Sequence, residues 1–120
     1  MEAVQYFTNL ALAAFVDGSF DQTELALLEK HAENLRLSSE VAQDVINKVA
    51  SGQLKEWVKP KSPEARQSAF KAVVRILRAD KKLTKKEQRM IKLLGMQLEI
   101  DDALIDRALS PSFKESTREV

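Results

Sequence analysis

Carboxylates near two short turns are the side chains whose type and spacing could bind a metal ion. Asp17, Asp21 and Glu24 lie close together in the sequence, and Asp80 and Glu87 stand 63 residues after Asp17 and Glu24. Carboxylate oxygens are the ligands that Ca²⁺ and Mg²⁺ prefer. These five residues are therefore a candidate site for a divalent cation, the one cofactor that the sequence suggests.

The same carboxylates also have a structural interpretation. Asp21 and Glu24 have the spacing of a capping box, in which two side chains accept backbone hydrogen bonds at a helix start. The partial positive charge of a helix N-terminus disfavours a cation there. The spacing also departs from the calcium-loop pattern, with a phenylalanine and a glutamine where further ligands would fall. We interpret Asp21 and Glu24 as helix caps. Asp17 and Asp80 remain candidate ligands, which could share one ion if the fold brings the two turns close together.

A basic stretch between residues 66 and 92 is the second candidate site. Residues 1–60 carry five Lys/Arg against nine Asp/Glu, a net charge of −4, and residues 61–120 carry fourteen against nine, a net charge of +5. The candidate residues for binding an anionic partner are Arg75, Arg78, Lys81, Lys82, Lys85, Lys86 and Arg89. They could face a nucleic acid, an anionic membrane surface or an acidic protein.

A solvated face is the interpretation of the basic stretch that the sequence favours. The pI of about 8.0 is mild, and no helix carries a convincing set of base-reading side chains. Nucleic acid is therefore disfavoured as a partner without being ruled out. Docking of the acidic half of one copy on the basic half of another leaves a homo-oligomer open.

Catalytic groups are scarce in this chain. There is no cysteine, and His31 is the single histidine, so neither a zinc pair nor a nucleophile with its base is recognisable. We interpret His31 as an ordinary, partly exposed helix residue. Trp57 fits a lid over the core and a partner-binding aromatic equally well. The sequence therefore predicts a protein that is not an enzyme.

The elements that must position these residues are helices. Hydrophobic residues make up 44% of the 120 residues and recur at spacings of three and four, while three glycines and three prolines leave few turns. Helices should begin near residues 2, 21, 38, 63, 84 and 101, with the first and fourth ending near residues 16 and 79. We predict an all-α fold, a compact bundle of about six helices forming one domain over residues 1–110, followed by a frayed tail at 111–120.

An internal repeat relates the two halves of this domain. An offset of 63 residues places Phe7 on Phe70 and Leu35 on Leu98, and the residue classes match across about forty positions. The repeat predicts two pseudo-twofold-related three-helix halves, at about 2–52 and 63–109, joined by a linker at 53–62. Each half would expose its apolar stripes alone, and packing the two together buries them.

The turn motif of each half resembles that of a known family. Residues 14–25 (AFVDGSFDQTEL) resemble the motif of the TerB-like tellurite-resistance family, and residues 78–87 repeat it with Lys81 in place of glycine and Thr84 in place of the capping aspartate. The resemblance covers residues 1 to about 110. It implies a compact, internally repeated helical domain, a metal-binding role for acidic residues near the motif, and a place in stress, tellurite or metal-resistance complexes.

The expected function is that of a non-enzymatic interaction module with a protein partner. No signal peptide and no segment long enough to span a bilayer is visible, so we expect a cytoplasmic protein whose membrane contact, at the inner surface, would be peripheral. The alternative is a nucleic-acid-binding or regulatory protein that uses the basic stretch at residues 66–92.

Overall fold

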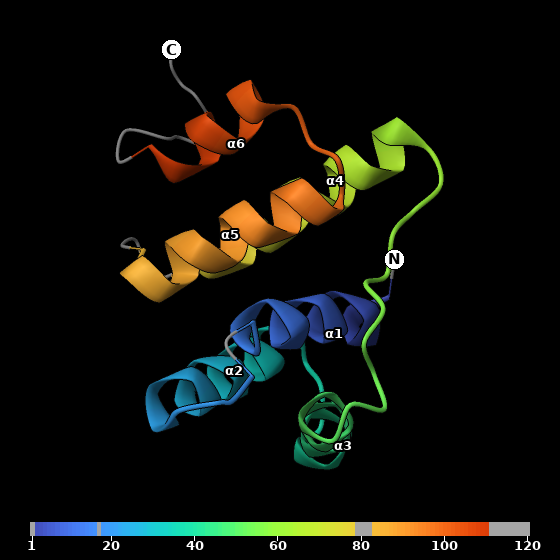
Figure 1. Ribbon diagram of the computed structural model, residues 1–120, viewed down its shortest axis with the longest axis vertical. Coiled ribbons are helices and arrows are strands. Elements are labelled where there is room, and N and C mark those ends of the chain that lie inside the picture. The colour runs from blue at the N-terminus through green and yellow to red at the C-terminus, as the bar shows by residue number, and fades with distance from the viewer. Residues whose placement is uncertain (1, 17, 79–82, 111–120) are drawn as a thin grey trace.

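The computed structural model describes residues 2–16, 18–78 and 83–110, and within these ranges the chain is all-α. The described helices are α1 (Ala3–Ala14), α2 (Gln22–Asn34), α3 (Ser39–Ala50), α4 (Pro63–Leu77), α5 (Lys85–Gln97) and α6 (Asp102–Leu109). The predicted all-helical class and the number of helices are confirmed for these residues. Figure 1 shows α1, α2 and α3 on one side of the molecule and α4, α5 and α6 on the other, joined by an extended linker. The predicted tail at 111–120 lies outside the described residues.

Side-chain caps set the helix starts where the sequence predicts them. In α2 the Asp21 side chain accepts the Glu24 N–H at 2.7 Å, and the Glu24 side chain accepts the Asp21 N–H at 2.9 Å. Thr84 and Glu87 form the same capping box in α5, at 3.1 and 2.9 Å. The serines that precede α3 and α4 also accept a backbone N–H from the first turn. The interpretation of Asp21 and Glu24 as caps is confirmed.

Some helix ends differ from the prediction. α1 begins with a hydrogen bond from the Glu2 N–H to the Gln5 side chain, which the sequence pattern did not predict. Asp101 precedes α6 as expected, but its side chain makes no cap hydrogen bond. α1 and α4 end at Ala14 and Leu77, two residues before the predicted ends, where the backbones of Phe15 and Arg78 leave the helical region with ψ values of 10° and 4°.

The ends of α2 and α5 share one backbone geometry. Arg36 and Glu99, which are 63 residues apart, have φ values of 62° and 58°. In each case the N–H of the following residue donates to the carbonyl five residues back at 2.9 Å. This is the hydrogen bond of a Schellman motif, formed here without the usual glycine.

The packing of the halves is less alike than their helix ends. α3 packs mainly on α1, whereas its counterpart α6 packs mainly on α5. The repeat therefore recurs in local structure but not in the arrangement of the third helix. Duplication of a half-domain with a pseudo-twofold relation stays a prediction.

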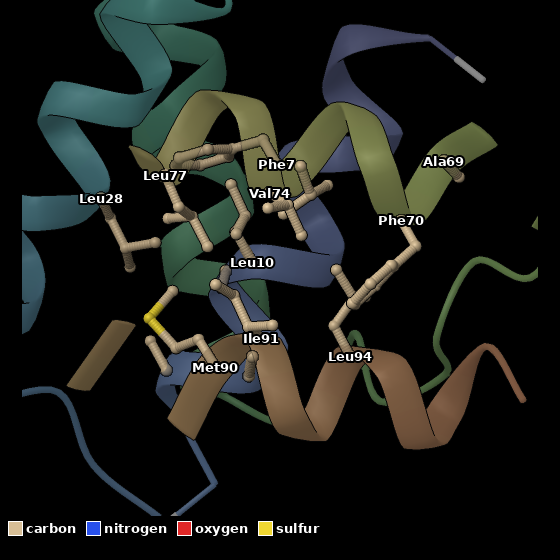
Figure 2. Packing of buried hydrophobic residues seen from close by; sticks show 14 of the residues in the cluster. Phe7, Leu10, Leu28, Ala69, Phe70, Val74, Leu77, Met90, Ile91 and Leu94 are labelled. Atoms are coloured by element: carbon tan, nitrogen blue, oxygen red, sulfur yellow. The ribbon is translucent and has the colours of Figure 1, made fainter. Parts of the chain in front are cut away.

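The core takes buried side chains from all six described helices. Figure 2 shows side chains from α1, α4 and α5 meeting in one cluster, with Leu28 of α2 at its edge. The largest fully buried apolar side chains are Phe7, Phe70, Leu10, Leu28, Leu77, Ile91, Leu94 and Leu98. Burial of each such side chain contributes about 1.5–3 kcal/mol. The described helices include none long and apolar enough to cross a bilayer.

The linker between the halves is fixed to α1 by one buried amide. Asn9 is 1% exposed; its Nδ2 donates to the Val58 carbonyl at 2.9 Å and its Oδ1 accepts the Val58 N–H at 2.8 Å. Both backbone groups of Val58 are thereby satisfied where the linker has no regular structure. Trp57 lies partly buried against the core, in agreement with the lid interpretation.

Candidate functional site

The acidic residues at the start of α2 meet a lysine from α5. Lys86 Nζ donates to Asp21 Oδ2 at 2.7 Å and lies 3.7 Å from Glu24 Oε2. The hydrogen bond from Lys86 is the largest cause that holds the pKa of Asp21 below its ordinary value. The same bond raises the pKa of Lys86. An ammonium group of the chain itself therefore stands where a bound cation was predicted.

Glu87 is buried beside His31. The His31 Nε2 and Glu87 Oε2 atoms are 3.3 Å apart, and the side chains are 1% and 3% exposed. Burial is the largest influence on the pKa of Glu87 and raises it, but the imidazole and the Thr84 backbone N–H together outweigh burial and leave this pKa below its ordinary value. The pair joins α2 to α5 across the interface of the two halves.

The prediction of a partly exposed His31 is wrong. The imidazole lies inside the molecule, and neither ring nitrogen meets hydrogen-bond geometry with another described residue. The physical reason is its position on α2: His31 follows Leu28 by three residues and precedes Leu35 by four, so it lies on the helix face that is turned inward. That spacing is visible in the sequence and could have indicated burial.

The three predicted metal ligands that the structure describes do not form one set. Asp21 and Glu24 share a lysine, whereas Glu87 faces His31. Within residues 2–16, 18–78 and 83–110 there is no group of three or more His, Asp or Glu side chains that could hold a metal ion. Asp17 and Asp80, like Lys81 and Lys82, lie outside these ranges. Their part in a metal or anion site stays a prediction.

Two members of the predicted basic stretch bind within the fold. Arg78 donates from Nη1 and Nη2 to two carbonyls at the end of α6, at 2.8 and 3.0 Å, where the helix dipole favours a cation. Lys86 holds the start of α2, as described above. Arg75, Lys85 and Arg89 are exposed. Roles inside the structure therefore account for Arg78 and Lys86, and the solvated-face interpretation of the other basic residues stays a prediction.

An open groove between α2 and α3 was not predicted. Its volume is about 240 Å³. It is lined by Glu29, Ala32, Glu33, Leu37, Ser39, Ala42, Gln43 and Ile46. The floor is apolar and the rims are polar, because small side chains from both helices leave space that their exposed neighbours border.

The sides of the groove differ in charge. Glu29 and Glu33 are exposed on the α2 rim, one helical turn apart, whereas Ser39 and Gln43 line the α3 rim. The acidic pair at a spacing of four was visible in the sequence. The small residues that open the groove looked like ordinary core positions, so no local signal marked it.

The comparisons with known proteins identify no relative of this chain. The resemblance to the TerB-like family therefore rests on the turn motifs alone. In comparisons with family models, with curated proteins and with solved structures, nothing matches the chain.

Proposed function

We propose that this chain is a non-enzymatic interaction module that binds a helical segment of a protein partner in the groove between α2 and α3. The observation that carries the proposal is the groove itself, with an apolar floor of Ala32, Ala42 and Ile46 between two polar rims. Helix-in-groove recognition uses an apolar stripe of the partner, with side chains three and four positions apart. Two helices that are joined by a short connection supply such a trough.

The size of the groove favours side chains over a small molecule. Sites for small molecules usually enclose about 300–1,000 Å³ and bury most of the ligand. The groove between α2 and α3 has about 240 Å³ and is open to solvent. A few apolar side chains from one face of a partner helix fit this space, while the rest of that helix stays in water.

The resemblance to TerB-like proteins extends the proposal. On that resemblance the module would act in the cytoplasm, in stress, tellurite or metal-resistance complexes, with the inner membrane surface as a place of peripheral contact. The sequence hypothesis of a divalent cation belongs to the same extension. Calorimetric titration of the metal-free protein with Ca²⁺, Mg²⁺, Mn²⁺ and Zn²⁺ tests it, because loss of binding in Asp17→Asn/Asp80→Asn would assign the ion to those two carboxylates.

The groove is tested with peptides selected from an unbiased display library against the purified chain. Gln43 and Asn47 are exposed on α3 and hydrogen-bond to each other, but Gln43 lines the groove and Asn47 does not. Gln43→Trp should weaken binding of the selected peptides about tenfold or more, an effect of about 1.4 kcal/mol. Asn47→Trp removes the same hydrogen bond and should leave affinity unchanged. Failure to select any peptide, or equal affinity for both variants, would overturn the proposal.

A second candidate function is binding of an anionic partner by α5. Lys85, Arg89 and Lys92 are exposed at spacings of four and three on this helix. Such a face follows a row of phosphates or carboxylates. Lys85→Glu should then reduce binding to a nucleic acid or to anionic vesicles and lessen its salt dependence, whereas binding that does not change with salt would exclude this candidate.

A further inference from the structure

We infer that the helix bound in the groove carries Lys or Arg at positions i and i+4 on one flank of its apolar stripe, the flank that faces α2. This inference rests on the proposed function and names the class of partner: a helix that is basic on one side. The observation behind it is the difference in charge between the two rims of the groove.

The α2 rim is an acidic pair without a counterion. Glu29 and Glu33 are both exposed, and in the part of the chain that the structure describes no cation pairs with either carboxylate. Asp44 and Asp21 are exposed and paired, with Lys48 at 3.0 Å and with Lys86, whereas Glu40 and Glu56 likewise make no ion pair within the described residues. The lining of the groove therefore carries negative charge on its α2 side that no described cation pairs with.

The spacing of the two glutamates sets the spacing of the partner's cations. Like charges four residues apart destabilise a helix by about 0.2–0.5 kcal/mol, so a cation placed between or beside them relieves a repulsion in addition to forming new ion pairs. Four residues correspond to about 6 Å along a helix. A partner helix that runs along the groove brings its own residues i and i+4 to the same spacing.

The opposite rim favours uncharged side chains on the partner. Ser39 and Gln43 line the α3 side of the groove, and neither bears a charge. A cation on that flank of the partner would gain no counterion there. The recognition pattern is therefore one-sided, which separates it from a helix that is basic all round and binds any acidic surface.

The test uses three versions of the tightest peptide selected against the chain. The residues at i and i+4 that flank its apolar stripe are Lys, Gln or Glu, and affinity is measured by fluorescence anisotropy at low and at physiological salt. The Lys version should bind about tenfold more tightly than the Gln version at low salt, and the Glu version more weakly. Glu29→Gln/Glu33→Gln should remove this preference. Glu40→Gln/Glu56→Gln makes the same charge change at exposed positions outside the groove and should keep it.

The outcomes separate this inference from the function on which it rests. Equal affinity of the Lys and Gln versions for the wild-type protein would overturn the inference, while their common sensitivity to Gln43→Trp would leave the groove as the binding site. A preference that survives Glu29→Gln/Glu33→Gln would also overturn it. Insensitivity of all three versions to Gln43→Trp would overturn the proposed function itself.

Discussion

Replacement of Gly95 by alanine tests how closely α6 approaches α5. A Cβ atom at this position would lie 2.6 Å from Ile105 Cδ1, 2.7 Å from Ile105 Cγ1 and 3.3 Å from Phe70 Cε1. Gly95 has an ordinary helical conformation, so its role is to leave space and not to supply unusual backbone angles. Ile105 is 4% exposed and packed inside, so its side chain cannot simply swing into solvent.

Two opposing terms decide the sign of the effect. Alanine is favoured over glycine inside a helix by about 1 kcal/mol. Overpacking of a filled core costs about 1–3 kcal/mol. Because two atoms of Ile105 would be closer to the new Cβ than real contacts allow, the cost of overpacking should exceed the gain in helix propensity. We expect Gly95→Ala to lower the free energy of unfolding by about 1 kcal/mol.

The sign should reverse when Ile105 is shortened. In an Ile105→Ala background the two clashing atoms are gone, so Gly95→Ala should raise the free energy of unfolding by about 1 kcal/mol through helix propensity and partial filling of the cavity. Urea unfolding followed by circular dichroism gives all four free energies of this double-mutant cycle. Stabilisation by Gly95→Ala in the wild-type background, or the same sign in both backgrounds, would refute the close contact between α5 and α6.

Three further perturbations test contacts between distant parts of the chain. Asn9→Ala removes both hydrogen bonds to Val58 and should lower the free energy of unfolding, measured in urea, by about 2 kcal/mol. The backbone amides of the linker should also exchange hydrogen faster, and unchanged exchange would contradict the role of Asn9 in holding the linker. In an NMR titration, Lys86→Met should return the pKa of Asp21 toward its ordinary value of 3.8, because the hydrogen bond from Lys86 is the largest cause of the lowered pKa. The pKa of Glu87 is lower in the folded than in the unfolded state, so its contribution to stability is present above about pH 4.5 and is lost as the pH falls through the folded pKa. Glu87→Gln should therefore flatten the acid limb of the stability curve, and an unaltered limb would assign acid sensitivity to other carboxylates.

Local signals in the sequence were sufficient for the helices. Asp21 with Glu24, and Thr84 with Glu87, predicted two helix starts because a capping box depends on side chains and backbone within four residues. The proline at position 63 marked the start of α4 in the same way. Apolar periodicity predicted that the chain is helical, since burial of an apolar stripe is the main source of helix stability in a folded protein.

The sequence also predicted matching bounds for α2 and α5, but not how the helices around them pack. The starts and ends of α2 and α5 lie 63 residues apart, as the alignment of the halves predicts. α6 packs on α5 beside Gly95, where the absence of a side chain leaves room for Ile105. A glycine inside a helix does not indicate which distant side chain will fill the space beside it.

Only the tertiary structure decided what the charged residues do. Lys86 looked like a surface cation and neutralises Asp21, 65 positions away, while His31 looked like a surface imidazole and is buried against Glu87. The groove between α2 and α3 likewise exists only once both helices are in place. Caps and helical faces follow from neighbours within a few residues. Ion pairs, close contacts and grooves follow from which surfaces meet, and that is settled by the packing of the whole chain, where many weak contacts between distant residues act together.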